Sequence, residues 1–185
     1  MKLILFLLMF TASLFSSNLS TLYKLYEKQE YEKACNYAFK YAYKKKNKAS
    51  ENYLTLYGLS CLETNNLSRV AIPMTSLTKS KDARANASYF GTILLQKQLL
   101  LQALIDEKPL GELYLPTTNF VLSKVFALFL KKRYSLKEGV YKLTDKDDKH
   151  IEYRLYMKKN RKKSSNYMII DIYKDARFTK RYQYR

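Results

Sequence analysis

Few residues in this sequence break or link secondary structure: 4 glycines and 3 prolines occur among 185 residues. Their scarcity excludes a Gly/Ser-rich linker, a collagen-like tract and a glycine-rich phosphate-binding loop. Acidic residues are also scarce, 16 against 34 lysines and arginines, so the formal net charge is +18. A surface with this charge attracts anions. The hydrophobic fraction of 47% is ordinary for a globular protein, and the length suits one domain or two small subdomains sharing a core.

Residues that usually carry catalysis are also missing. The single histidine, His150, follows two aspartates in a polar stretch, where we expect an exposed ring rather than a general base. Two cysteines and one distant histidine do not match a zinc site, and the acidic stretch of residues 145–149 lacks the glycine and distal glutamate of an EF-hand. Ser76-Leu-Thr-Lys79 matches the Ser-x-x-Lys string of penicillin-recognising enzymes, without its companion motifs. The sequence predicts a protein that is not an enzyme and holds no cofactor or metal.

The start of the chain indicates a compartment. Lys2 precedes an apolar run from Leu3 to Phe15, which is too short to span a bilayer comfortably. This pattern predicts a secretory signal peptide over residues 1–19, with the cleavage position left open. The protein is then exported, either periplasmic or secreted. The alternative is an uncleaved segment that anchors the chain in a membrane.

One helix organises the first half of the chain. From Asn52 to Asn66, apolar residues recur at spacings of three and four and therefore share one helical face. Gly58 interrupts that face, and because a glycine inside a helix costs stability, it indicates that another helix backbone comes close there. We expect Tyr53 and Tyr57 on this helix to contribute to an interaction surface.

This helix, the Asn65-Asn66 turn and a second helix over Leu67–Leu77 have an upstream counterpart. Tyr31 and Ala34 correspond to Leu67 and Val70, which places the two copies 36 residues apart. The pattern resembles a tetratricopeptide repeat, whose period is about 34 residues, over roughly Leu22–Leu77. The resemblance implies stacked helical hairpins that present a protein-binding surface, although unrelated hairpins would give a similar pattern.

Cys35 and Cys61 would lie on neighbouring helices of such stacked hairpins. An even number of cysteines permits a disulfide in an exported protein. We predict a Cys35–Cys61 disulfide, and the alternative is two buried thiols that act as small apolar groups.

The second half changes from helical to alternating periodicity near Tyr134. The sequence predicts an α+β fold with a helical subdomain over residues 20–108 and a helix-plus-sheet subdomain over residues 117–185. The expected elements of the second half are a long helix and then a shorter one, followed by a four-stranded antiparallel meander: Lys81–Asp106, Asn119–Lys132, Val140–Thr144, Ile151–Lys158, Tyr167–Lys174 and Phe178–Tyr184.

Positive charge concentrates in this sheet, because the stretch from Lys131 to Arg185 holds 18 basic and 7 acidic residues. Basic residues interleaved with aromatic ones can bind single-stranded nucleic acid, but export argues against that partner. In a cell envelope the same electrostatics would bind anionic lipids or acidic glycans. The candidate contact residues of the sheet are Arg154, Lys158, Arg161, Lys162, Lys163, Arg177, Arg181, Tyr182 and Arg185.

The leading functional hypothesis from the sequence is an exported, non-enzymatic protein-interaction module of the cell envelope. Its partner would be an unidentified protein that contacts the helical hairpins. The alternative is a protein that binds anionic envelope polymers or a membrane surface through the basic C-terminal sheet.

Overall fold

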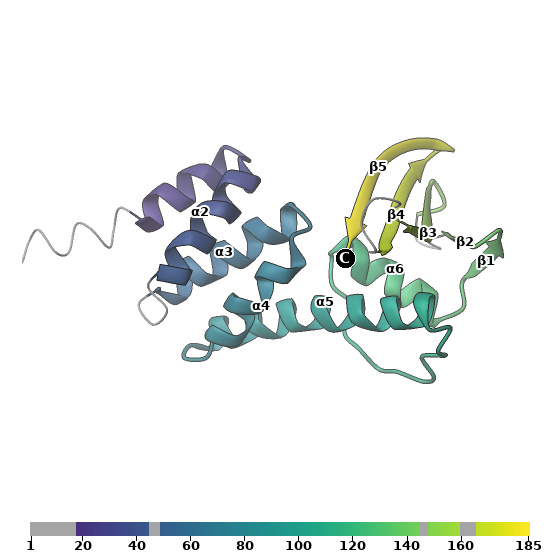
Figure 1. Ribbon diagram of the computed structural model, residues 1–185, viewed down its shortest axis with the longest axis horizontal. Helices are drawn as coiled ribbons and strands as arrows, with labels where there is room; N and C mark the ends of the chain where they lie inside the picture. The colour runs from purple at the N-terminus through teal and green to yellow at the C-terminus, as the bar shows by residue number, and fades with distance from the viewer. Residues whose placement is uncertain (1–17, 45–48, 145–147, 160–165) are drawn as a thin grey trace, which may run out of the picture. The chain divides into compact units, whose positions relative to one another are not determined.

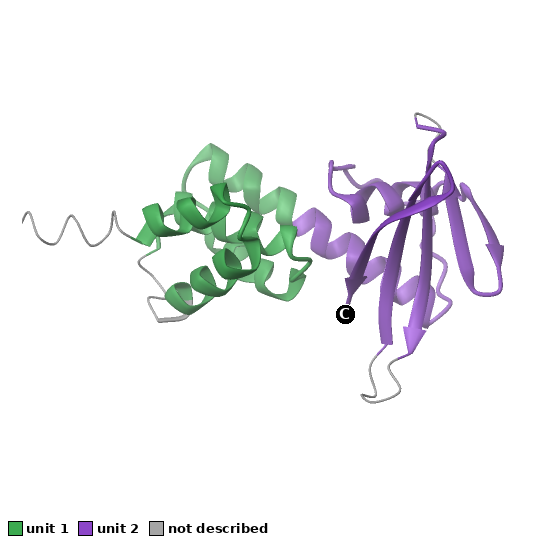
Figure 2. Ribbon diagram, turned by 90° about the horizontal axis from the view of Figure 1, so that it is seen from above, with its two compact units in different colours: residues 1–90 green, residues 91–185 purple. Residues whose placement is uncertain are grey.

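The computed structural model describes residues 18–44, 49–144, 148–159 and 166–185, and its fold is α+β (Figure 1). The chain divides into two compact units, residues 1–90 and 91–185, with the boundary inside a long helix (Figure 2). The subdomain boundaries inferred from the sequence, at residues 108 and 117, stay a prediction. Most of the predicted signal peptide lies outside the described residues. Within the described residues, no helix is both long enough and apolar enough to cross a membrane.

Unit 1 is built from helices joined by short turns. The described part begins with a helix over residues 18–27, and then come α2 (Tyr31–Lys44), α3 (Glu51–Glu63), α4 (Leu67–Ser76) and the first part of α5 (Lys81–Ile105). Gln29 and Asn65 adopt positive φ angles of 57° and 58° in the turns that follow the first helix and α3. Asn tolerates this left-handed conformation, which explains why α3 ends at the predicted Asn65-Asn66 turn.

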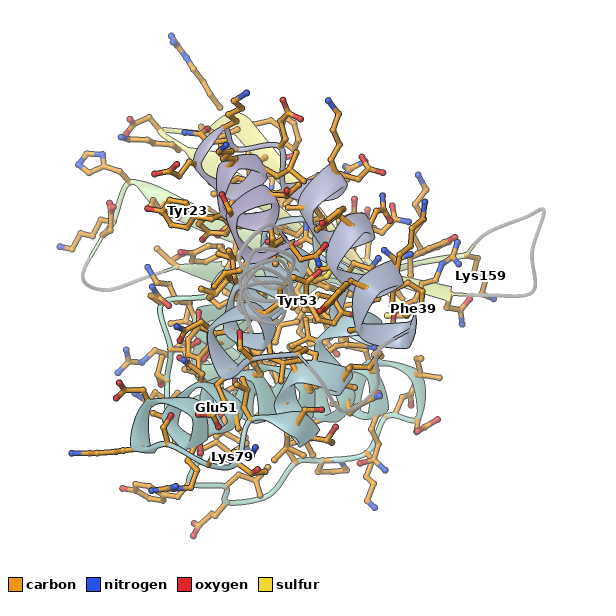
Figure 3. All side chains as sticks on the ribbon, turned by 90° about the vertical axis from the view of Figure 1, so that its left-hand side faces the viewer. Tyr23, Phe39, Glu51, Tyr53, Lys79 and Lys159 are labelled. Carbon is orange, nitrogen blue, oxygen red and sulfur yellow. A yellow bond between two sulfur atoms is a disulfide. The ribbon has the colours of Figure 1, made fainter. Side chains whose placement is uncertain are left out.

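Side-chain caps fix the starts of α3 and α5. The Ser50 hydroxyl accepts a hydrogen bond from the Tyr53 N–H at 3.2 Å, and the Ser80 hydroxyl accepts one from the Ala83 N–H at 3.0 Å. The Glu51 carboxylate also accepts the Lys79 N–H at 2.7 Å (Figure 3). The bond to Glu51 ties the turn before α5 to the first residue of α3.

Unit 2 combines the end of α5 with α6 (Val121–Leu130) and an antiparallel sheet. The sheet has the order β1-β2-β3-β4-β5, so each strand pairs with its neighbours in sequence. Its strands are β1 (Tyr134–Lys137), β2 (Val140–Thr144), β3 (Ile151–Lys159), β4 (Asn166–Lys174) and β5 (Arg177–Tyr184). One face carries buried apolar residues, which we call the inner face: Leu143, Tyr153, Leu155, Met168, Ile170 and Tyr184. As expected, α6 with its buried Phe126 contacts this sheet, at β2.

The sheet has five strands, so the prediction of four was wrong. The helix that we expected to reach Lys132 ends at Leu130, and β1 follows after only a short turn. A turn at Glu138 and Gly139, with φ angles of 51° and 75°, connects β1 to β2, and both positive values suit a two-residue hairpin. β1 has only four residues, and its Leu136 is 55% exposed, so it is both shorter and less buried than β3 and β4.

Candidate anion-binding surface

The face of the sheet opposite the apolar core carries most of its charged side chains, and we call it the outer face. Successive residues of a strand point to opposite faces, so Arg154 and Lys142 lie on the outer face because their neighbours Leu155 and Leu143 lie on the inner one. The pairing registers place Lys142, Arg154, Asp171 and Arg181 in one row across β2, β3, β4 and β5. The row therefore contains three cations and one carboxylate.

Asp171 neutralises the β5 end of this row. It is 3% exposed and holds Arg181 through two hydrogen bonds, from Nε to Oδ1 at 2.6 Å and from Nη2 to Oδ2 at 2.7 Å. The Tyr156 hydroxyl donates a third bond to Oδ2 at 3.1 Å. Burial raises the pKa of Asp171, but these hydrogen bonds and the charges of Arg181 and Arg154 lower it more, so the pKa lies below its ordinary value. The Arg181 guanidinium is thus already paired within the sheet.

The Arg154 side chain also has partners within the protein. Its Nε donates to Glu152 Oε1 at 2.6 Å, and its guanidinium lies 3.7 Å from the centroid of the Tyr173 ring. A bond from Nε leaves the guanidinium edge formed by the two Nη groups for other partners. Because Glu152 is paired with Arg154, its negative charge is compensated within β3.

The other predicted contact residues do not form one patch. Arg185 lies over the Tyr167 ring at 4.8 Å and bonds to its hydroxyl, whereas Tyr182 occupies the inner-face row with Ile170 and stacks on Tyr184. Arg177 is exposed at the start of β5, and Lys158 is exposed near the end of β3. Arg161, Lys162 and Lys163 lie outside the described residues.

A hollow of about 740 Å³ opens at the β1 side of the sheet, and we call it the basic hollow. Its lining combines cations, hydroxyl groups and one carboxylate: Arg133, Tyr134, Ser135, Lys142, Thr144, Lys149 and Glu152. Within the described parts of the chain, Arg133, Lys142 and Lys149 form no ion pair, while Glu152 is held by Arg154. Three exposed cations therefore surround one hollow without a carboxylate partner among the residues that the structure describes.

Reasoning from the sequence missed the residues of the basic hollow for an identifiable reason. The pairing of β1 with β2 brings Arg133 and Ser135 beside β2, and β1 was not predicted. Ser135 pairs with Lys142 across these two strands. Gly139 was the available signal, because a glycine between two short alternating stretches favours a hairpin.

In unit 1 the structure corrects the expected role of Tyr53 and Tyr57. The two residues are 2% and 0% exposed, so they belong to the core and do not form a surface. Among the described residues, neither hydroxyl has a hydrogen-bond partner. Burial raises the pKa of Tyr57 to about 12, although the charge of Arg69 acts in the opposite direction.

The structure places Cys35 and Cys61 at disulfide distance, with Cα atoms 4.9 Å apart, as the sequence predicts.

The Nδ1 atom of His150 lies 2.6 Å from the Oδ1 atom of Asp175, and both side chains are exposed. In the described ranges, no cluster of three or more His, Cys, Asp and Glu side chains could hold a metal ion.

Comparisons with known proteins do not indicate a function for this chain. No protein-family model, no curated protein and no solved structure matches the chain. The resemblance to tetratricopeptide repeats therefore stays a prediction from the sequence.

Proposed function

We propose that the protein is an exported binding protein without catalytic activity, and that the basic hollow binds the phosphate groups of an anionic membrane surface. The observation that carries this proposal is the set of three cations, Arg133, Lys142 and Lys149, that line one hollow without an ion-pair partner among the described residues. Export is supported by the apolar N-terminal stretch and by the Cys35–Cys61 pair, since disulfides persist in oxidising compartments.

The position of Lys142 supports a binding role over a purely structural one. Lys142 pairs directly with Arg154 across β2 and β3, and the Glu152 carboxylate already bonds Arg154, so Lys142 has no carboxylate partner among the described residues. An anion in the hollow would supply the missing counter-charge. Ser135 and Thr144 add hydroxyl groups that can donate to phosphate oxygens.

The aromatic side chains of the outer face favour a phosphate surface over nucleic acid. Binding of single strands depends on bases that stack on open ring faces. Here the Tyr173 ring is covered by Arg154 at 3.7 Å and the Tyr167 ring by Arg185 at 4.8 Å. These rings are therefore occupied by the protein's own cations on one side.

Vesicle co-sedimentation tests the proposal. We expect the protein to sediment with vesicles that contain phosphatidylglycerol and not with pure phosphatidylcholine, and we expect binding to fall steeply between about 0.05 M and about 0.5 M salt. Each lysine near an anionic surface contributes about 1 kcal/mol, so the double variant Lys142→Glu/Lys149→Glu should bind at least about tenfold more weakly.

The matched control is Lys24→Glu/Lys40→Glu, which makes the same charge change at two exposed positions of unit 1. It should bind more tightly than the hollow variant, although its lower net charge weakens binding slightly. Equal binding by the two double variants, or binding that salt does not weaken, contradicts a specific role of the hollow.

A groove in unit 1 supports a second candidate function, binding of a partner protein. The groove has a volume of about 560 Å³ and is lined by the helix over residues 18–27, by α3 and by the start of α5. Tyr23 lines it and is 53% exposed, so an aromatic side chain is available to a partner. Tyr23 therefore replaces Tyr53 and Tyr57 as the contact that we propose (Figure 3).

Site-specific photo-crosslinking tests this second function. A photoreactive residue at Tyr23 should capture a defined protein in cells, and the same residue at the exposed Lys40 on α2 should not. Capture of the same proteins from both positions, or of none from Tyr23, would argue against a partner in this groove.

A further inference from the structure

A second, larger depression lies in unit 2, with a volume of about 1190 Å³, and we call it the apolar groove. It is formed by the end of α5, the chain that follows it, the end of α6 and the β1–β2 hairpin. Its apolar lining includes Leu104, Phe129, Leu130, Leu136, Tyr141 and Met157. Leu136 is 55% exposed, so its side chain offers apolar surface to a ligand in the groove.

Three aromatic rings form one wall of the apolar groove. The ring centroids of Phe129 and Tyr134 are 5.2 Å apart, those of Phe129 and Tyr141 are 5.2 Å apart, and those of Tyr134 and Tyr141 are 5.0 Å apart. Rings in mutual contact at these distances leave no room for a ligand between them. They therefore act as a rigid wall along which an apolar chain can lie.

The apolar groove and the basic hollow meet at β1. Tyr134 lines both depressions, while its neighbours Arg133 and Ser135 line only the hollow and Leu136 lines only the groove. The register places the groove residues Leu136 and Tyr141 on the inner face of the sheet and the hollow residues Ser135 and Lys142 on the outer face. Because β1 is the edge strand, a ligand that occupies both depressions would pass around the edge of the sheet at Tyr134.

The two depressions differ in charge, and this difference determines which end of a ligand each would bind. The charged residues that line the groove are of both signs, with an acidic excess: Glu107, Glu112, Glu138, Lys108 and Lys132. The hollow has three cations and one carboxylate that Arg154 compensates. An anionic group is therefore favoured in the hollow and disfavoured in the groove.

We propose that the basic hollow and the apolar groove together form one site for a single anionic amphiphile, with its phosphate headgroup in the hollow and its acyl chain along the aromatic wall. This inference rests on the proposed binding of phosphate groups in the hollow and adds the class of ligand. It also accounts for Leu136, because an acyl chain would cover the exposed side chain. Ligand pockets commonly combine an apolar lining with a few polar groups that fix orientation.

Calorimetric titration with soluble, single-chain amphiphiles below their micelle-forming concentrations tests the inference on the whole protein. Dodecyl phosphate should bind with one molecule per chain. Inorganic phosphate, which lacks the chain, and dodecyl maltoside, which lacks the charge, should each bind at least about tenfold more weakly. Equal binding of dodecyl maltoside and dodecyl phosphate would overturn the inference, because the hollow would not distinguish the headgroup.

Two kinds of variant separate the headgroup from the chain. Lys142→Glu alters the hollow, and Leu136→Gln removes apolar surface from the groove without adding charge; each should weaken dodecyl phosphate binding several-fold. Lys40→Glu and Leu95→Gln are the matched controls at exposed positions, since Leu95 is 47% exposed and does not line the groove. Both controls should bind like the wild type.

The failure of this inference can be told apart from the failure of the proposed function. If Leu136→Gln binds dodecyl phosphate as tightly as the wild type, no chain occupies the groove and the inference falls, while vesicle binding through the hollow is unaffected. If Lys142→Glu loses vesicle binding but still binds dodecyl phosphate, the amphiphile lies elsewhere and the inference falls as well. If neither vesicles nor dodecyl phosphate bind, both proposals fall together.

Discussion

The ring of Phe90, on α5, lies against Gly58 in the middle of α3, where a Cβ atom at residue 58 would overlap the ring carbons. The sequence indicated a close approach at Gly58 but suggested the backbone of another helix as the neighbour. The structure shows an aromatic side chain instead, and Phe90 is fully buried there. Gly58 thus creates the space that a large core residue fills.

Gly58→Ala should therefore destabilise unit 1. In an open helix this substitution stabilises by roughly 0.5–1 kcal/mol, whereas overpacking of a well-packed core costs about 1–3 kcal/mol. We expect the second effect to dominate, because a ring fixed in the core can move only with its neighbours. Urea unfolding that shows a higher midpoint for Gly58→Ala would contradict the close packing.

The matched background is Phe90→Leu, which removes the ring from Gly58. In that background Gly58→Ala should cost much less or become stabilising, and the double-mutant cycle should show a coupling energy of about 1 kcal/mol or more. Strictly additive effects would mean that Phe90 is not what limits residue 58.

Tyr57→Phe should stabilise the protein. The Tyr57 hydroxyl is buried and has no hydrogen-bond partner among the described residues, so it lost its bonds to water on folding without replacing them. Removal of the oxygen should raise the free energy of unfolding by about 1 kcal/mol. Thermal and urea unfolding measure the change. A loss of stability of similar size would indicate that the hydroxyl has a partner after all.

Reduction of the Cys35–Cys61 pair should destabilise unit 1. The two residues are 26 apart in sequence, and closing a loop of this length stabilises a fold by roughly 3–4 kcal/mol in the chain-entropy description. Urea unfolding of the wild type should therefore depend strongly on reductant, while unfolding of Cys35→Ser/Cys61→Ser should not. Equal stability of the wild type with and without reductant would mean that the thiols are not joined in the protein as isolated.

The sequence predicted the long, strongly patterned parts of the fold. Buried apolar residues recur at regular spacing in α3, in β3 and in the long helix α5, so the type of each element followed from periodicity. The α+β class followed from the same patterns. β1 was missed because it has only four residues: its apolar and polar residues alternate, but four is the shortest run in which alternation indicates a strand.

The candidate site was predicted only in its electrostatic character. Charge alone does not show which cations are already bound: Arg181 is held by Asp171 and Arg185 by Tyr167, whereas Lys142 is not paired with any carboxylate among the described residues. Such pairing depends on strand register, and the register places Arg181 beside Asp171 ten residues away. The apolar face of α3 was likewise interpreted wrongly as an interaction surface, because helical spacing identifies an apolar face without showing whether other elements cover it.

Asp171 should give the stability of unit 2 a dependence on acid pH. Its folded-state pKa is lowered, since hydrogen bonds from Arg181 and Tyr156 outweigh the effect of burial, whereas its unfolded-state pKa is about 3.9. A carboxyl group with a lowered folded pKa contributes stability that is fully present above the unfolded pKa and is lost as the pH falls through the folded pKa. Asp171→Asn should therefore cost about 2 kcal/mol at neutral pH, because it breaks charge-assisted bonds at a buried position.

This cost should shrink as the pH falls below about 4, where the carboxyl group of the unfolded chain becomes protonated, and should be smallest below the lowered folded-state pKa. Glu152→Gln is the matched control: it removes a carboxylate that bonds Arg154 at 2.6 Å, but the side chains of that pair are about one-third exposed (34% and 32%). Because solvent screens such a pair, the control should cost less than about 1 kcal/mol at any pH. Urea unfolding of both variants at neutral and acid pH measures the two curves. A constant difference between Asp171→Asn and the wild type down to pH values well below 4 would show that the ionised carboxylate is not what holds Arg181 and Tyr156 in place.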